Sequence, residues 1–278
     1  MSTLRFQQID VFASQPMMGN PLALVHDAED LTDEEMARLA RWTNLSETAF
    51  LLPPTNPQAD YRVRIWTPRR ELPFAGHPTL GSCHGWLSRS IKPKAPDCIV
   101  QECAIGLVKI RRDGSRLAFA APPLLKSGPV DPVTLKAIAQ GLNLSLSQIV
   151  AHQIVDNGPG WVALLLDSAK HVLEIRPDAS ALVPYKVGVA GPYPQGHEAQ
   201  FEVRAFAADA GGGEDPVTGS LNAGIASWFI QAGIAPGNYV VSQGTALGRQ
   251  GRLYIQQVDG QIWVAGQSLT TIEGTLSL

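Results

Sequence analysis

Two segments of the chain, separated by about half its length, carry the same succession of features. Residues 61–66 and 201–206 each read as a strand around a Val-Arg pair, and the arginines lie 140 positions apart (204 − 64). Each strand leads into an acidic, proline-containing loop, and each loop leads into an apolar helical segment, at 82–87 and at 221–230. A repeat of this length in 278 residues predicts two similar domains, with the matching loops facing each other across a cleft.

The second loop, residues 211–220, holds three glycines, an acidic pair, a proline and a small polar turn. Apolar residues after it recur at helical spacing, on one face: Leu221, Ile225, Trp228 and Phe229. Thr218 or Ser220 is expected to cap this helix. The backbone N–H groups of its first turn then form an anion seat next to Asp215. This arrangement predicts a seat for an anionic substrate, with a carboxylate that handles a proton.

Composition narrows the class of protein. A hydrophobic content of 45% and a charged content of 17% indicate a globular chain, long enough for two ordinary domains. The net charge of −3 offers no field for binding a polyanion, so nucleic acid is not expected as a partner. Apolar runs fall short of the roughly 20 residues that cross a bilayer, and the first residues enter a strand pattern instead of a signal peptide. We therefore expect a cytoplasmic protein that does not bind a membrane.

The order of elements predicts an α+β fold. Strands are many and helices few, and the turn spacing favours antiparallel pairing. We expect two pseudo-symmetric domains, each a mostly antiparallel sheet wrapped around a central helix. The proline-rich stretch near residue 122 is the best linker, which places the first domain at 1–122, joined by the last strand at about 268–278, and the second at 123–267. The strand at 161–166 is interpreted as the counterpart of the strand that follows Glu47.

Local signals also place a helix at 31–43. Thr32 precedes it and Glu35 comes three residues later, which is the spacing of a capping box.

Four polar residues near the loops are candidates for chemistry, and each has a structural alternative. Glu47 is either a general acid or base in a closed cleft or an exposed turn residue. His77 either binds a substrate carboxylate and shuttles a proton or only caps a helix. Asp215 is a second proton carrier, an orienting group, or an ordinary acid at a helix start. The Ser220 hydroxyl binds substrate, caps the helix, or does both.

Other chemistries find little support. The glycine-rich loop lacks the residue order of a P-loop, and its acids and proline break the glycine spacing of a dinucleotide site. His77 and His84 stand seven apart, and Cys98 and Cys103 lack a matching second pair, so no metal site is expected. Cys83 falls inside an apolar helical segment and is expected to be a core residue rather than a nucleophile. An odd number of cysteines argues against a disulfide framework.

Five motifs occur in series along the chain. Together they resemble the PhzF-like phenazine-biosynthesis family, within the diaminopimelate epimerase fold group. The motifs are Gly-Asn-Pro-Leu-Ala at 19–23, Asn-Leu-Ser-Glu-Thr-Ala-Phe at 44–50, Glu-Leu-Pro-Phe-Ala-Gly-His-Pro-Thr-Leu-Gly at 71–81, Glu-Asp-Pro-Val-Thr-Gly-Ser at 214–220 and Ser-Gln-Gly at 242–244.

The resemblance implies proton transfer at carbon without cofactor or metal, at a site between two pseudo-symmetric domains. It implies that Glu47, His77 and Asp215 are catalytic. It also implies substrate-binding positions, which are Asn20, Gly76, Gly219 and Ser220. The substrate is expected to be a small molecule that bears a carboxylate, and the protein is expected to form a homodimer.

In the related epimerases, two cysteines do the proton work. Here Ala75 and Asp215 are interpreted as standing in those places, which favours a carboxylate-run isomerase over a two-thiol racemase. Two alternatives stay open: an amino-acid epimerase or racemase, and a non-catalytic protein that binds small carboxylates.

Overall fold

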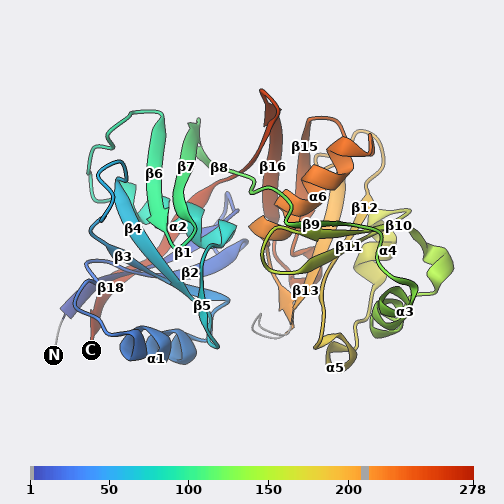
Figure 1. The fold of residues 1–278 in the computed structure, drawn as a ribbon, viewed down its shortest axis with the longest axis horizontal. Helices are drawn as coiled ribbons and strands as arrows, with labels where there is room; N and C mark the ends of the chain where they lie inside the picture. The colour runs from blue at the N-terminus through green and yellow to red at the C-terminus, as the bar shows by residue number, and fades with distance from the viewer. Residues whose placement is uncertain (1–2, 208–212) are drawn as a thin grey trace. The chain divides into compact units, whose positions relative to one another are not determined.

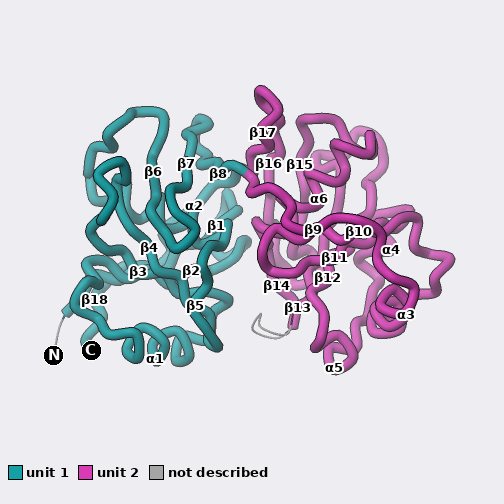
Figure 2. Tube along the Cα trace, in the orientation of Figure 1, with its two compact units in different colours: residues 1–120, 265–278 teal, residues 121–264 magenta. Residues whose placement is uncertain are grey.

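The computed structural model describes residues 3–207 and 213–278. It separates into two compact units, residues 1–120 with 265–278 and residues 121–264 (Figure 2). Gly211 and Gly212 of the predicted loop lie outside the described residues.

The first unit is a mixed sheet around one helix (Figure 1). Its elements are β1 (Thr3–Val11), β2 (Asn20–Val25), α1 (Asp33–Thr43), β3 (Glu47–Leu52), β4 (Tyr61–Trp66), β5 (Glu71–Leu72), α2 (Gly76–Leu87), β6 (Cys98–Cys103), β7 (Gly106–Asp113), β8 (Arg116–Ala120) and β18 (Ser268–Ser277). The strands pair in the order β18-β1-β2-β3-β4-β6-β7-β8, with the short β5 also on β4. The β2–β3 and β4–β6 pairs are parallel, whereas the other pairs in this order are antiparallel.

The second unit has the same plan. Its elements are β9 (Lys126–Gly128), α3 (Pro132–Gly141), a 3₁₀ turn (Leu146–Gln148), β10 (Ile149–Asp156), β11 (Trp161–Leu166), α4 (Ala169–Glu174), α5 (Ala179–Leu182), β12 (Lys186–Pro192), β13 (Phe201–Ala207), β14 (Glu214–Asp215), α6 (Gly219–Gln231), β15 (Asn238–Gln243), a 3₁₀ turn (Thr245–Leu247) and β16 (Gly251–Val258). A further strand, β17 (Gln261–Gly266), crosses the division between the units. The order is β9-β10-β11-β12-β13-β15-β16, with β14 on β13 and with parallel β11–β12 and β13–β15 pairs.

The repeat in the sequence is thus a repeat of topology, in an α+β fold. Strands β1 to β7 correspond in order and direction to β10 to β16, and α2 corresponds to α6. One predicted correspondence is wrong. β11 is the counterpart of β2, and the counterpart of β3 is β12, because the parallel registers Leu22↔Glu47 and Trp161↔Lys186 are equivalent. Lys186 therefore occupies in the second unit the position that Glu47 occupies in the first.

The central helices are buried on almost every side. The sequence predicted one apolar face for α6, but Asn222, Ala223 and Ala226 are buried as well, so most of this helix lies in the core of its unit. Two equivalent glycines let the helices approach the sheet. A Cβ atom on Gly81 of α2 would lie 2.5 Å from the Leu22 side chain, and one on Gly224 of α6 would lie 2.5 Å from a backbone carbonyl of β10.

The capping residues in the sequence were sufficient to predict where α1 begins. Thr32 and Glu35 form the predicted capping box, with the Thr32 hydroxyl accepting from the Glu35 N–H at 3.3 Å. None of the described helices is both long enough and apolar enough to cross a bilayer.

Candidate active site

In the first unit, the structure brings Glu47 and His77 into contact. Glu47 is the first residue of β3 and His77 the second residue of α2, and the His77 Nδ1 lies 2.9 Å from the Glu47 Oε2. The histidine side chain is 4% exposed and the glutamate side chain 17%. Because an ionised carboxylate only accepts, Nδ1 carries a proton towards Glu47. The other ring nitrogen, Nε2, is buried without a hydrogen-bond partner among the described residues.

The start of α2 supplies further donors. The helix begins at Gly76 after Ala75, an N-cap residue that offers no side-chain hydrogen bond. The first N–H groups of any α-helix have no acceptor within the helix, so those of Gly76 and His77 are directed out of its N-terminus. Next to the imidazole, they make this end of α2 suited to an anion.

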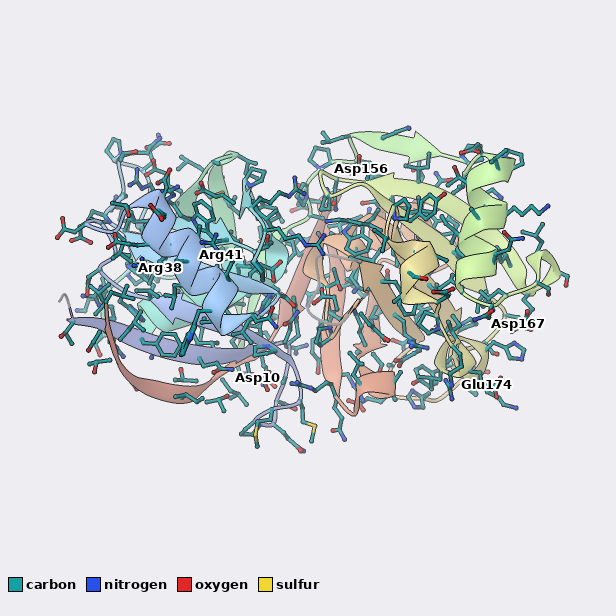
Figure 3. All side chains as sticks on the ribbon, turned by 90° about the horizontal axis from the view of Figure 1, so that it is seen from below. Asp10, Arg38, Arg41, Asp156, Asp167 and Glu174 are labelled. Atoms are coloured by element: carbon teal, nitrogen blue, oxygen red, sulfur yellow. The ribbon has the colours of Figure 1, made fainter. Side chains whose placement is uncertain are left out.

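Asn20 begins β2, where it is 1% exposed and pairs with Val11. The loop before it is held by Asp10, whose carboxylate accepts from the N–H groups of Met18 at 2.9 Å and Gly19 at 3.0 Å. Asp156, at the end of β10, holds the equivalent loop of the second unit in the same way, from Gly158 and Gly160. Figure 3 labels both aspartates.

In the second unit, Asp215 closes β14 and accepts a hydrogen bond from the Thr218 hydroxyl at 2.6 Å. Thr218 is the N-cap residue of α6, but its side chain makes no capping bond. Ser220 lies within the first turn of α6. The predicted side-chain cap is therefore wrong. The Thr218 hydroxyl donates to Asp215 and accepts from the Gln243 amide instead of from an N–H of the helix.

Two neighbouring side chains contact Ser220. Its hydroxyl accepts from the indole Nε1 of Trp161 at 3.0 Å, and Asn157 holds the Ser220 carbonyl at 2.8 Å. An indole N–H only donates, so the serine oxygen is the acceptor and its own proton points elsewhere. Ser220 and the neighbouring Gly219 N–H therefore form a donor pair at this helix start.

The two N-cap residues correspond to each other in the repeat. Ala75 is the N-cap residue of α2 and Thr218 that of α6, each directly before a glycine. The residue that corresponds to Ala75 is thus Thr218 and not Asp215, which corresponds instead to Leu72 of β5. Neither N-cap residue is a thiol.

Each of the two loops is clamped by an arginine, which the sequence analysis did not recognise. Arg64 of β4 binds both oxygens of Glu71 at 2.7 Å. Arg204 of β13 binds both oxygens of Glu214, at 2.8 and 2.7 Å. Both glutamates lie in the short strands β5 and β14, so each clamp fixes the loop that enters a central helix. The available signal was that a glutamate follows each Val-Arg strand, seven residues after Arg64 and ten residues after Arg204.

Cys83 is confirmed as a core residue. It is fully buried in α2, and burial raises the pKa of its thiol to about 12, so the thiolate that a nucleophile requires is disfavoured.

Comparison with known proteins bears on this geometry. A model of the phenazine biosynthesis-like family, PhzC-PhzF, matches residues 9–274. The chain belongs to this family. Among its relatives are antisense-enhancing sequence 1 of Schizosaccharomyces pombe, 34% identical over 99% of each chain, and a trans-2,3-dihydro-3-hydroxyanthranilate isomerase of Pseudomonas aeruginosa, 33% identical over 97% of this chain and 94% of the relative.

A crystal structure of a PhzF-family protein from Bacillus anthracis matches with a TM-score of 0.85 at 21% identity, over the whole of both chains, which establishes the PhzF fold here. Further relatives of the chain are also named isomerases. The chain is accordingly a PhzF-like isomerase. Its candidate residues fall into two sets, with Asn20, Glu47, Gly76 and His77 in the first unit and Asp215, Gly219 and Ser220 in the second.

Proposed function

We propose that this protein moves a proton between two carbons of a small carboxylate-bearing substrate, without a cofactor, and that Glu47 carries the proton. The observation that bears most of the argument is the contact between Glu47 and His77, 2.9 Å apart at the start of a buried helix. A carboxylate that is hydrogen-bonded and largely screened from water is suited to general acid–base work.

The reaction balances with Glu47 as the single proton carrier. Its carboxylate removes a proton from one carbon, and the C–H electron pair moves into the adjacent π system. The same proton returns from Glu47 to another carbon of that system. The substrate gains and loses no atoms, and the double bonds shift. A positioned acid–base group of this kind contributes about 10²–10⁴-fold to the rate.

His77 has two roles in this proposal. Its Nδ1–H orients the Glu47 carboxylate, and its buried Nε2 meets the substrate. As an imidazolium, the ring presents Nε2–H to a substrate oxygen. The N–H groups at the start of α2 add to the attraction for the carboxylate.

The second set of residues supplies polar groups suited to a substrate that gains charge. The Ser220 hydroxyl, whose oxygen is occupied by Trp161, and the Gly219 N–H donate to oxygen atoms that gain charge in the enolate-like transition state. Fixed donors at a developing charge are often the largest catalytic term. Asp215 accepts a hydrogen bond from a polar group of the substrate.

The substrate class comes from the relatives. Isomerases named for trans-2,3-dihydro-3-hydroxyanthranilate occur among them, and that compound carries the carboxylate, the transferable ring hydrogen and the double bonds that the mechanism requires. It is the first compound to test.

The test is turnover of that compound in D₂O, followed by NMR, for wild type and for Glu47→Gln. We expect Glu47→Gln to lose turnover and solvent exchange by at least about 100-fold, in line with the contribution of a general base. Its affinity for 3-hydroxyanthranilate, an aromatic analogue without the transferable hydrogen, should stay close to wild type.

Glu34→Gln, an equivalent change on an exposed helix turn, is the matched control and should leave turnover unchanged. Equal loss of binding and turnover in Glu47→Gln would remove Glu47 from the chemistry. Deuterium at a retained, inverted stereocentre would instead identify an epimerase, and bound ligands that never exchange would identify a binding protein.

A further inference from the structure

One of the five motifs, Ser-Gln-Gly at 242–244, has no part in the mechanism above, yet its glutamine is the most fully bonded side chain near the second loop. Gln243 ends β15 and is fully buried. Its Oε1 accepts from the Thr218 N–H at 3.0 Å and from the Asn222 side chain at 2.8 Å. Its Nε2 donates to the Thr218 hydroxyl at 2.9 Å and to the Asp215 carbonyl at 3.1 Å.

These contacts fix the direction of the whole chain of hydrogen bonds. The Thr218 backbone N–H can only donate, so the amide oxygen of Gln243 must face it. The amide nitrogen then faces the Thr218 hydroxyl and donates to it. A hydroxyl has a single proton, and that of Thr218 is directed to the Asp215 carboxylate at 2.6 Å.

We propose that Gln243 and Thr218 are positioning residues that keep Asp215 an ionised hydrogen-bond acceptor at a fixed place beside the start of α6. A hydrogen bond donated to a carboxylate is stronger for the charged form than for the protonated form, so the Thr218 hydroxyl favours the ionised Asp215. The charged groups on the same hairpin, Arg204 and Glu214, are engaged with each other. We call the hydrogen bonds from Gln243 to Thr218 and from Thr218 to Asp215 the relay. Its role in catalysis rests on the proposed function, whereas the hydrogen bonds themselves do not.

The first unit also joins a glutamine to a threonine, but at other positions, because Gln101 corresponds to Val241 and Thr79 to Asn222. Gln101 of β6 donates to the Thr79 hydroxyl at 3.0 Å, and Thr79 donates to the Ala75 carbonyl at 2.8 Å. That relay ends on the backbone at the start of α2, so it anchors the helix only. The relay of the second unit ends on a carboxylate, and this difference is what assigns it a role in holding charge.

The test that needs no substrate is a pH titration of the Asp215 carboxyl by ¹³C NMR. Thr218→Val removes the hydroxyl and should move the midpoint of Asp215 upward, because hydrogen bonds to a carboxylate favour its charged form. Thr218→Ser should restore the wild-type midpoint. Thr79→Val, the same change in the first unit, should leave it in place. If the valine variant fails to fold, Thr218→Ala carries the test without added bulk.

The part played by Gln243 is tested by a double-mutant cycle. Gln243→Glu keeps the size of the side chain but replaces the donor that faces Thr218 with an acceptor. Its effect on the Asp215 midpoint should differ between the Thr218 and Thr218→Val backgrounds, because the relay is already broken in the second. Additive effects would overturn the role of Gln243. An unchanged midpoint in folded Thr218→Val would overturn the relay.

Kinetics separate this inference from the proposed function. With trans-2,3-dihydro-3-hydroxyanthranilate, Thr218→Val should lower kcat about tenfold, the size expected of one hydrogen bond to a charged group, with a smaller change in KM. Thr218→Ser should recover most of the loss. If wild type does not turn over this compound while the NMR midpoint still shifts, the proposed substrate fails and the relay stands. Normal kcat in Thr218→Val would overturn the catalytic meaning of the relay.

Discussion

The two units contain the same Arg–Glu clamp in different surroundings. In the first unit, the side chains of Arg64 and Glu71 are 24% and 36% exposed, and the arginine also reaches the exposed Asp33. In the second, Arg204 and Glu214 are only 5% and 11% exposed, and the arginine also donates to two backbone carbonyls at the end of α4. The same bond geometry thus occurs in a partly exposed ion pair in one unit and in a buried ion pair in the other.

The difference in exposure indicates which of the two ion pairs contributes more to the stability of its unit. Breaking a buried pair leaves a charge without compensation and costs about 3–5 kcal/mol, whereas exposed pairs contribute roughly 0–1 kcal/mol. The second loop, which carries Asp215, is therefore the one whose position depends on its clamp.

The largest expected effect comes from Glu214→Gln. It leaves the Arg204 guanidinium buried without its counter-ion, so we expect a loss of about 3 kcal/mol in the free energy of unfolding of the second unit. Urea denaturation with hydrogen exchange of β13 amides measures it. Glu71→Gln is the matched variant of the first unit and should cost less than about 1 kcal/mol. Equal losses would show that burial does not distinguish the two clamps.

Acid should weaken the first unit more than the second. His26 directly follows β2 and is fully buried. Burial lowers the pKa of its side chain from 6.5 to about 4. The folded state therefore binds this proton less readily than the unfolded chain, and stability is lost as the pH falls from about 6.5 to about 4. At 1.36 kcal/mol per pKa unit, the loss approaches about 3 kcal/mol.

The apolar Leu165 occupies the corresponding place in the second unit, according to the β2–β3 and β11–β12 registers. His26→Gln retains a partner for Gln7 and should flatten the pH dependence of the first unit over that window. Hydrogen exchange of β1 and β10 amides at pH 7 and pH 5 compares the units. A greater loss in β10 would contradict the assignment.

The smallest effect concerns the two glycines that let the central helices approach the sheets. Gly224→Ala places a methyl group 2.5 Å from the backbone oxygen of Val155, whereas Gly81→Ala meets the flexible end of Leu22 at the same distance. Overpacking costs about 1–3 kcal/mol, and we expect Gly224→Ala near the top of this range and Gly81→Ala near the bottom. Thermal unfolding of the two variants gives the order, and the reverse order would show that β10 yields more readily than Leu22.

Much of this architecture could be predicted from the sequence, because short sequence patterns mark each element of the repeat. The Val-Arg strands, the acidic loops and the helix starts recur at nearly constant spacing, so they predicted two similar units with a central helix each. The capping box at Thr32 was predictable for the same reason, since both partners lie within four residues. Glu47 and His77 were found because each stands in a recognisable motif, and the structure brings them into contact.

What the sequence concealed depends on partners that are distant along the chain. Thr218 is a residue type that commonly caps helices, but its hydroxyl donates to Asp215 and accepts from Gln243. Gln243 joins Thr218 only because β15 pairs with β13 in parallel register. The match between Glu47 and Lys186 is invisible as a sequence similarity and appears only in the strand registers.

The last strand has a consequence for how the protein is made. β18 follows the whole second unit in the chain, yet it pairs along the full length of β1, from Thr3 to Val11. During synthesis, the second unit can therefore complete its sheet while the edge of β1 that pairs with β18 is still unpaired. An unpaired strand edge can pair with another molecule. We therefore expect the first unit to be the more aggregation-prone one while the chain is being synthesised. A fusion or truncation at the carboxyl end would be felt first in the sheet that was synthesised earliest.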